Sequence, residues 1–331
     1  MYKITLIPGD GIGPEITAAA KTVIEATGID IEWDVQQAGE AGIAKHGNPF
    51  SEEVIESLHR NKIALKGPLT TPIASGFRSI STALRRELDL YINFCPILSY
   101  KGIKSRYEDI DLVVIRENTE DLYAGIEHMV GKDAAESIRI VTRKGSERIL
   151  RYAFEYAKRN DRKMVTAVHK ADIMKCTDGL FLEAARQIAG EYPEIEFDDC
   201  IMDSMSMQLV RKPELYDVLV MPNLYGGILG DLGAGLVGGL GVVPMANIGD
   251  KIAVFEPIHG TAPKYAGQSR ANPMAMILSG VLMLEYLGEF DVAEKTKKAL
   301  QEVLMEGKTL TQDLGGTATT SEFGDAVASK L

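Results

Sequence analysis

Cysteine is scarce in this sequence: Cys95, Cys176 and Cys200 are the only three, and they lie far apart without a C-x-x-C pair. Neither a disulfide framework nor a zinc site is therefore indicated. No uninterrupted apolar run reaches the roughly 18 residues of a membrane-spanning helix, so no membrane partner is expected. The first ten residues show no basic segment followed by an apolar one. That pattern indicates no signal peptide, and a cytoplasmic protein is the default expectation.

An excess of positive charge is also absent. The chain has 36 Lys and Arg against 47 Asp and Glu, a net charge of −11. Such an acidic chain is a poor partner for nucleic acid or for an anionic membrane. Any anionic substrate must be held by a few locally concentrated cations. The composition, 45% hydrophobic and 25% charged, is that of a globular protein, and 331 residues suit two domains.

Short apolar runs alternate with helical patterns along the chain. A helix is predicted to begin at Pro14, because proline is favoured in the first turn. The alternation of strands and helices predicts an α/β architecture with a mostly parallel sheet. Seven buried strands are predicted, at 4–8, 62–67, 89–97, 110–118, 162–170, 216–223 and 251–257.

Three glycines, Gly9, Gly11 and Gly13, lie between the first strand and the first helix. Their spacing is G-x-G-x-G, whereas the Rossmann dinucleotide-binding loop has G-x-G-x-x-G. The pattern therefore does not indicate a Rossmann site, and a tight turn that needs glycine explains it equally well.

Hydroxyl groups and cations are dense at 66–71 and 77–86, directly after a predicted strand, where open α/β sheets place ligands. A capped helix with an exposed basic face is the alternative interpretation. Arg116 ends another strand and is followed by Tyr123, which together could clamp a carboxylate and donate a proton. A solvated turn would give the same pattern.

Lys170 ends the strand 162–170, where partial burial would lower its pKa and make it an acid or base. A surface lysine is the alternative. Asp203 and Asp231 offer the oxygen ligands that Mg²⁺ or Mn²⁺ prefers, but two carboxylates need a substrate to complete the shell. The loop that begins at His259 could enclose an adenosine or a phosphate, or His259 could simply bond the backbone of a turn.

In this order the motifs resemble the β-decarboxylating dehydrogenases, the family of isocitrate, isopropylmalate and homoisocitrate dehydrogenases. The resemblance extends from IPGDGIGPEI to TATTSEFGDAV. KGPLTTP, RENTEDLYAG, VHKADIMK and HGTAPKYAGQ are most similar to isocitrate dehydrogenases, and DLGGTATTSE is similar to their NAD-dependent branch. It implies a two-domain α/β fold that is not a Rossmann fold. The large domain would comprise 1–97 and 245–331 and carry the cofactor. The inserted smaller α/β domain, 98–244, would carry the dimer contacts, the metal site and the catalytic lysine.

The resemblance also implies a role for individual residues. Tyr123 and the partner subunit's Lys170 would be the acid and base, and Asp231 and the partner's Asp203 would bind Mg²⁺ or Mn²⁺. The substrate would be bound by Lys66, Thr70, Ser79, Ser81, Arg85 and Arg116, with Arg78 and Arg86 adding positive charge. The cofactor would be bound by Ile12, Leu69, Thr71, His259, Gly260, Thr261, Ala262, Lys264, Tyr265, Ala271, Asn272 and Gln312.

The reaction implied by the resemblance is the metal-dependent oxidative decarboxylation of isocitrate to 2-oxoglutarate and CO₂, with hydride transfer to NAD or NADP. A homodimer with shared active sites would catalyse it. Two alternatives stay open: isopropylmalate or homoisocitrate as the substrate, and a non-catalytic regulatory subunit of a heteromeric NAD-dependent enzyme. Ser79 favours isocitrate. Lys264 and Tyr265 resemble the residues of NADP-dependent relatives, whereas Gln312 and Gly316 resemble the NAD-dependent branch, and NAD is favoured.

Four residues depart from the family pattern. Cys95 stands where the family usually has Arg, and Gly227 where it usually has Asp. Ser81 and Asp172 each replace a common Asn. The loss of one charge-assisted hydrogen bond costs on the order of 10–100-fold in transition-state binding. Because Tyr123, Lys170, Asp203 and Asp231 are all present, an active enzyme is favoured over a regulatory chain.

Overall fold

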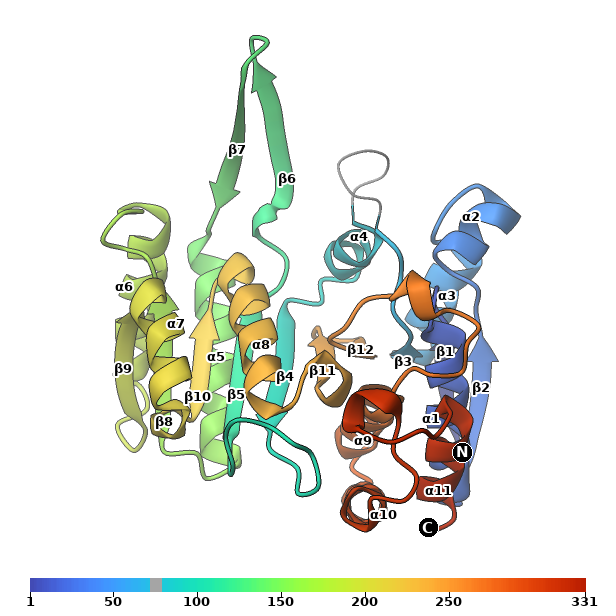
Figure 1. The fold of residues 1–331 in the computed structure, drawn as a ribbon. Helices are drawn as coiled ribbons and strands as arrows, with labels where there is room; N and C mark the ends of the chain where they lie inside the picture. The colour runs from blue at the N-terminus through green and yellow to red at the C-terminus, as the bar shows by residue number, and fades with distance from the viewer. Residues whose placement is uncertain (72–78) are drawn as a thin grey trace. The chain divides into compact units, whose positions relative to one another are not determined.

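The computed structural model describes residues 1–71 and 79–331, which form two compact units. Unit 1 comprises 1–81, 99–108 and 237–331, and unit 2 comprises 82–98 and 109–236 (Figure 1). These boundaries differ from the predicted 1–97, 98–244 and 245–331. The reason is that β4 (Ile92–Leu98) pairs antiparallel with β5 (Asp111–Glu117) along its whole length, which joins 82–98 to unit 2.

In unit 1, five strands follow the order β2-β1-β3-β12-β11. Strand β1 (Tyr2–Ile7) lies parallel to β2 (Ile31–Val35) and β3 (Ile63–Lys66). Strand β12 (Ala253–Pro257) is parallel to β3 and antiparallel to β11 (Pro244–Ile248). The predicted, mostly parallel arrangement is confirmed here, with β11 as the exception.

The helices of unit 1 surround this sheet section. The most deeply buried is α9 (Met274–Tyr286), which is apolar all round because it packs against β3, β11, β12 and other helices. The others are α1 (Gly13–Ala26), α2 (Glu40–His46), α3 (Glu52–Asn61), α10 (Phe290–Glu306), α11 (Thr320–Ala328), and the 3₁₀ turns Leu240–Val242, Pro263–Tyr265 and Gln312–Leu314.

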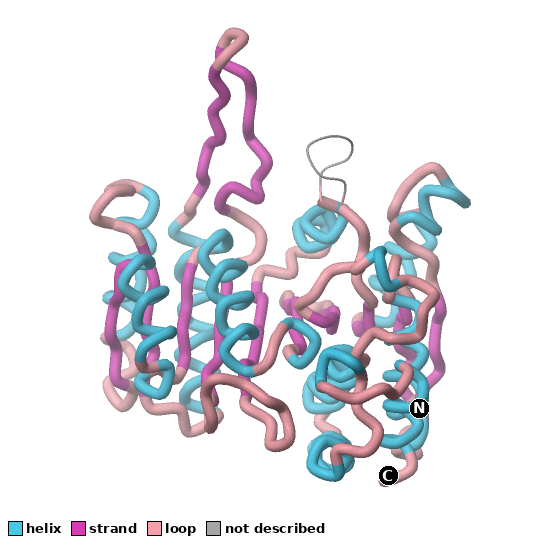
Figure 2. The backbone as a smooth tube through the Cα atoms, in the orientation of Figure 1, coloured by secondary structure: helices cyan, strands magenta, loops and turns pink. Residues whose placement is uncertain are grey.

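In unit 2, the strands follow the order β4-β5-β10-β8-β9. Strand β4 is antiparallel to β5, and β5, β10 (Val218–Met221), β8 (Met164–His169) and β9 (Glu196–Ile201) are parallel to their neighbours. Helices α5 and α6 pack together on one face, with α7 and α8 on the other (Figure 2). Their bounds, with the remaining helical segments, are α4 (Ile80–Glu87), α5 (Arg143–Arg159), α6 (Thr177–Ala189), α7 (Met202–Arg211), the 3₁₀ turn Pro213–Leu215 and α8 (Asn223–Val237).

A two-stranded antiparallel arm projects from the rest of unit 2 (Figure 1). It is built from β6 (Asp121–Val130) and β7 (Ala134–Ile140). Residues 126–138 are exposed on both strands, whereas Asp121 at the base is fully buried. The arm was not predicted, because its strands lack the buried apolar runs that mark the core strands.

The seven predicted strands are confirmed, and so is the helix that follows the glycine loop. Gly11 has φ of 61°, and a Cβ there would lie 2.1 Å from the carbonyl oxygen of Thr261. This close approach lets the amide of Ile12 donate to that same oxygen at 2.9 Å. The loop is therefore a tight turn that docks against Thr261.

Among the described helices, none is long and apolar enough to cross a membrane.

A buried ion pair joins Lys66 on β3 to Glu256 on β12. Their side chains are 1% and 6% exposed. Glu256 also accepts a hydrogen bond from Asn247 at 2.6 Å, and the Lys66 amine donates to the Gly67 carbonyl at 3.1 Å. Lys66, which the resemblance places at the substrate, thus has almost no exposed surface from which to reach one. Its observed role is to neutralise a carboxylate inside the sheet.

We expect Lys66→Met to lower the free energy of unfolding by about 3–5 kcal/mol, because it leaves the Glu256 carboxylate buried without its counter-charge. The double variant Lys66→Met/Glu256→Gln removes both charges and should recover most of that loss. Urea denaturation followed by circular dichroism measures both values. A double variant as unstable as the single one would contradict this account.

Candidate active site

Unit 1 contains a cavity of about 660 Å³. Its walls come from the loops that follow β1 and β12 and from the 3₁₀ turns at 240–242 and 312–314. Eight predicted cofactor residues line it: Ile12, His259, Gly260, Ala262, Tyr265, Ala271, Asn272 and Gln312. Four further residues line it that were not predicted: Leu240, Gly241, Arg270 and Asp313. The remaining predicted residues, Leu69, Thr71, Thr261 and Lys264, are not part of this lining.

The polar groups of this cavity are fixed by one another. Asn272 donates to Asp313 at 2.9 Å and accepts from the amide of Met274 at 2.9 Å. Thr311 donates to the second carboxylate oxygen of Asp313 at 2.6 Å. Burial lowers the pKa of His259, so its ring is neutral at pH 7. A cavity of this volume, with few but ordered polar groups, has the properties of a small-molecule site and fits a nucleotide cofactor.

Asp10 fixes the loop that carries Thr70. The carboxylate is 5% exposed and accepts the amides of Glu40 and Thr70, both at 2.9 Å. Burial raises the pKa of Asp10, while these two hydrogen bonds act in the opposite direction. The hydroxyl of Thr70 lies 3.5 Å from that of Thr261. Asp10 was not predicted, although it lies inside the glycine loop, because a buried acceptor of two distant amides leaves no sequence pattern.

Two predicted substrate residues lie in unit 1 at the start of α4. Ser79 and Ser81 are partly buried. Arg78, which was expected to add positive charge beside them, lies outside the described residues.

In unit 2, Arg116 is the centre of the charged part of the site. It is 7% exposed, and its Nε and Nη2 atoms donate to the side-chain oxygen of Asn223 at 2.9 and 2.7 Å. The guanidinium carbon lies 5.1 Å from the centre of the Tyr123 ring. Burial and the neighbouring Arg85 lower the pKa of Arg116 to about 10, which leaves it charged at pH 7. Asp231 is close enough for Arg116 to lower its pKa, although desolvation raises it more.

The structure therefore brings together four of the predicted residues, Arg85, Arg116, Tyr123 and Asp231. They come from α4, β5, β6 and α8. Two cations close together, one of them buried beside a phenol, attract a multiply charged carboxylate.

Lys170 follows β8 and has a different environment from the predicted one. Its amine is paired with Asp203 and lies 3.5 Å from Asp172. The expectation of a lowered pKa is wrong: the hydrogen bond to Asp203, and the attraction of both carboxylates, raise the pKa of Lys170. The two acids lie 2 and 33 residues away in sequence, so the pattern of the strand alone did not reveal them.

The predicted metal ligands do not form a metal site within one chain. The Asp203 side chain is 71% exposed at the start of α7 and is paired with Lys170, whereas Asp231 lies beside Arg116. Within residues 1–71 and 79–331, no three His, Cys, Asp or Glu side chains are grouped so that they could hold a metal ion. The described donors of a single chain therefore do not fit a resident metal.

Cys95, which replaces the usual Arg, is 1% exposed in β4. Burial raises the pKa of its thiol to about 12. The thiol is therefore neutral at pH 7 and adds no positive charge to that of Arg85 and Arg116.

Comparison with known proteins identifies the family. A sequence model described as isocitrate/isopropylmalate dehydrogenase matches residues 3–327. The chain is 49% identical to the mitochondrial "Isocitrate dehydrogenase [NAD] catalytic subunit 5" of Arabidopsis thaliana, over 99% of this chain and 88% of that protein. It is 48% identical to a mitochondrial protein of Dictyostelium discoideum that is named as a regulatory chain of NAD-dependent isocitrate dehydrogenase, over 100% of this chain and 92% of that protein.

A solved structure is also similar. The isocitrate dehydrogenase from Methylococcus capsulatus is 53% identical and superposes with a TM-score of 0.98, over 100% of this chain and 99% of that one. The expected two-domain α/β fold is thereby confirmed, and the names of the relatives confirm the predicted enzyme class.

The expectation of a cytoplasmic protein is wrong. It rested on the absence of a signal-peptide pattern, whereas the relatives that match nearly the whole chain are named as mitochondrial proteins. The order of motifs, the fold and these similarities lead to one conclusion: the chain belongs to the isocitrate/isopropylmalate dehydrogenase family.

Proposed function

We propose that this protein catalyses the NAD-linked oxidative decarboxylation of isocitrate to 2-oxoglutarate and CO₂. The observation that carries the proposal is the buried cation Arg116, held between Asn223 and Tyr123 with Arg85 nearby. In a chain of net charge −11, two adjacent cations beside a proton donor are a specific arrangement for a polycarboxylate. Relatives named as NAD-dependent isocitrate dehydrogenases support isocitrate as that polycarboxylate.

The cofactor would occupy the cavity of unit 1, where bound NAD supplies the acceptor for a hydride. The ordered pair Asn272 and Asp313 offers hydrogen bonds to a nucleoside, and Ile12 offers an apolar contact. Tyr265 lines the cavity, whereas Lys264 is exposed and does not. A cavity without Lys264 in its lining supports NAD over NADP.

The chain's own residues have three chemical tasks. Arg85 and Arg116 bind the substrate carboxylates and so orient the carbon–carbon bond that breaks when CO₂ leaves. Tyr123 donates the proton that replaces CO₂ on the substrate carbon, and the Arg116 guanidinium beside its ring helps to hold it in place. Lys170 takes up the hydroxyl proton only as a neutral amine. Because Asp203 and Asp172 favour the charged amine, turnover requires these contacts to open.

A second copy of the chain is part of the proposal. Unit 2 exposes nine of the large apolar side chains of the described residues, and burial of such surface drives association. On the arm and the following segments they are Ile126, Met129, Val130, Ile138, Ile173, Met207, Val210, Leu215 and Ile228. We propose a homodimer in which each active site uses Tyr123 of one chain and the partner's Lys170. A Mg²⁺ or Mn²⁺ site would likewise need Asp231 and the partner's Asp203.

Two glycines of α8 make room for Arg116. A Cβ at Gly226 would lie 2.4 Å from the Cβ and Cγ atoms of Arg116, and one at Gly227 would lie 3.2 Å from its Nη1 atom. The aspartate usual in the family at 227 would therefore place a carboxylate against this guanidinium. Without that carboxylate, more of the Arg116 charge is available to the substrate.

The first test is the initial rate of the purified chain on D-isocitrate with Mn²⁺, measured in parallel with NAD and with NADP. We expect turnover, faster with NAD, and little or none with isopropylmalate or homoisocitrate. No turnover on any of the three would contradict the proposal. Activity that appears only after addition of a relative of the catalytic type would assign the chain a regulatory role.

The shared site predicts complementation between two inactive variants. Tyr123→Phe and Lys170→Met should each abolish most activity. If equal amounts are mixed through unfolding and refolding, half of the dimers are mixed and each has one intact site, so about one quarter of the wild-type rate should return. Two copies of either variant refolded alone are the control. A mixture as inactive as its components would exclude sites shared between chains.

The packing of α8 predicts that Gly226→Ala displaces Arg116. We expect the KM for isocitrate to rise on the order of 10–100-fold, the cost of one charge-assisted hydrogen bond. Gly235→Ala is the matched control, because its Cβ meets no atom within 4 Å. It should leave KM unchanged and stabilise the helix by up to about 1 kcal/mol. Equal KM values for the two variants would exclude Arg116 as the carboxylate clamp.

A further inference from the structure

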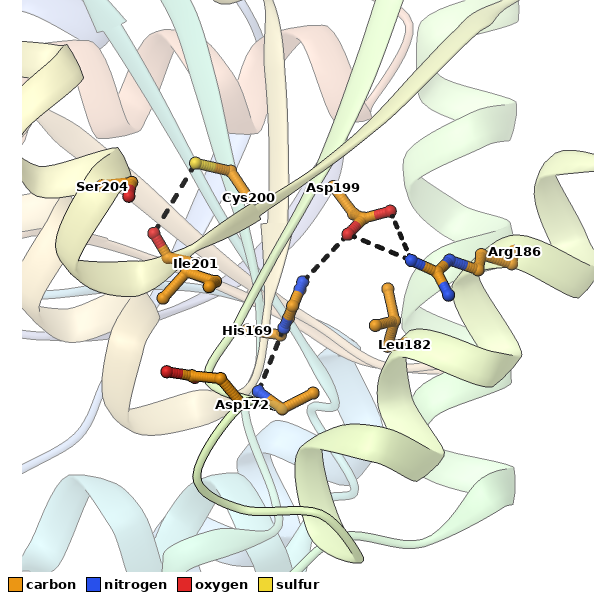
Figure 3. Close-up of a pocket in the computed structure, with 9 residues that line it drawn as sticks. His169, Asp172, Leu182, Arg186, Asp199, Cys200, Ile201 and Ser204 are labelled. Carbon is orange, nitrogen blue, oxygen red and sulfur yellow. Dashed lines mark hydrogen bonds and ion pairs between the residues drawn. The ribbon is translucent and has the colours of Figure 1, made fainter.

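Unit 2 also contains a cavity, of about 540 Å³, which lies beside the turn after β8. Its walls include Asp172, which contacts Lys170, and His169, Arg186 and Asp199, which have no role in the proposed function (Figure 3). His169 is the last residue of β8 and directly precedes Lys170. His169 is 5% exposed and is therefore a buried residue.

Both nitrogens of the His169 ring are engaged. Nδ1 accepts the backbone amide of Ala171 at 3.1 Å, and Nε2 lies 3.2 Å from Asp199 on the neighbouring strand β9. Figure 3 shows how the contacts continue from the His169 ring to Asp199 and on to Arg186. Arg186 donates to both carboxylate oxygens of Asp199, at 3.0 and 3.3 Å.

These contacts define the tautomer of the His169 imidazole. A nitrogen that accepts an amide hydrogen carries no proton, so Nδ1 is unprotonated and the hydrogen is on Nε2, directed at Asp199. Burial raises the pKa of Asp199, but the hydrogen bonds from Arg186 and His169 outweigh it and lower the pKa overall. Asp199 is therefore a charged acceptor that orients the imidazole. The pair Arg186 and Asp199 acts on Ala171 only through this ring.

The backbone amide of Lys170, next to that of Ala171, is held by a different side chain. The backbone N–H of Lys170 donates to Asp178 at 2.6 Å, and Asp178 is fully buried. Arg139 and Tyr225 bond to the same carboxylate at 2.9 and 3.0 Å. The backbone at 170 and 171 is thus fixed by two independent side chains.

We propose that His169 is a positioning residue for Lys170: as the Nε2–H imidazole oriented by Asp199, it holds the Ala171 amide and so sets the direction in which the Lys170 side chain leaves the backbone. This inference rests on the proposed role of Lys170 in proton transfer. A catalytic group that loses its orientation costs on the order of 10–100-fold in rate. The effect of His169 is therefore on kcat and not on the carboxylate clamp.

Two substitutions separate the two halves of the imidazole. In His169→Asn, the amide oxygen replaces Nδ1 and still accepts the Ala171 amide. In His169→Gln, the amide group replaces Nε2 and keeps Asp199, but no acceptor faces Ala171. We expect His169→Asn to retain kcat within about threefold, and His169→Gln to lower it about 10–100-fold with the KM for isocitrate nearly unchanged. If the two variants lose kcat equally, or in proportion to a loss of Tm, the proposal is overturned.

A second pair of variants tests the role of Arg186, which contacts Asp199. Arg186→Gln loosens Asp199 without touching the ring and should lower kcat several-fold. Arg151→Gln is the matched control, because Arg151 forms a similar two-bond contact with Glu191 elsewhere in unit 2. It should leave kcat unchanged. Equal rates for Arg186→Gln and Arg151→Gln would restrict any positioning role to His169 alone and overturn the role given to Asp199.

A measurement independent of turnover separates this inference from the proposed function. Reductive methylation with mass spectrometry gives the reactivity of Lys170, and Lys158, which is paired with Glu194, is the internal control. His169→Gln should change the reactivity of Lys170 at least about twofold, and His169→Asn should not, since reactivity follows the contacts that hold the proton. If that pattern appears in a protein that does not oxidise isocitrate, the proposed function fails and the positioning stands. If isocitrate is oxidised and both variants match the wild type, the positioning fails.

Discussion

The guanidinium of Arg139 is the interaction on which unit 2 depends. It pairs with Asp121 at 2.7 Å and with Asp178 at 2.9 Å, and neither carboxylate has any exposed surface. Burial disfavours the charge on Arg139, but the two carboxylates and Tyr225 raise its pKa overall. Two buried carboxylates without this cation would cost several kcal/mol each. Because Asp121 begins the arm, Asp178 lies in α6 and Tyr225 in α8, one cation holds three elements in register.

The two units carry different kinds of chemistry. The cavity of unit 1 is lined mainly by neutral groups, ordered around Asn272 and Asp313. Unit 2 concentrates charge, with Arg116 buried near Arg85 and with Lys170 held by carboxylates. The net charge of the chain does not reveal this separation, because it is a sum over all residues. A hydride acceptor needs shape and hydrogen bonds, whereas a polycarboxylate needs local positive charge.

The sequence predicted what contiguous residues determine. Apolar runs revealed the core strands. The motif at 259–272 supplies most of the residues that line the cavity of unit 1, because they contact one ligand-sized space directly. The exposed arm was missed, since it packs on no core. Asp10, His169 and Asp313 were missed or left without a role for a different reason: each acts on groups that only the fold brings near. The buried ion pair of Lys66 also left no signal, because a lysine beside a loop is indistinguishable in sequence from one paired inside a sheet.

The arm has a further consequence for handling the protein. Within the part of the chain that the structure describes, β6 and β7 pair only with each other, so each strand keeps an outer edge of unpaired amides and carbonyls. Such edges are templates for the addition of any extended chain. Charged side chains such as Glu127, and the cross-strand contact of His128 with Glu136 at 2.7 Å, oppose that addition. Colloidal stability in dilute solution, during purification or refolding, therefore depends on these few charges, and salt that screens them should favour aggregation through the arm.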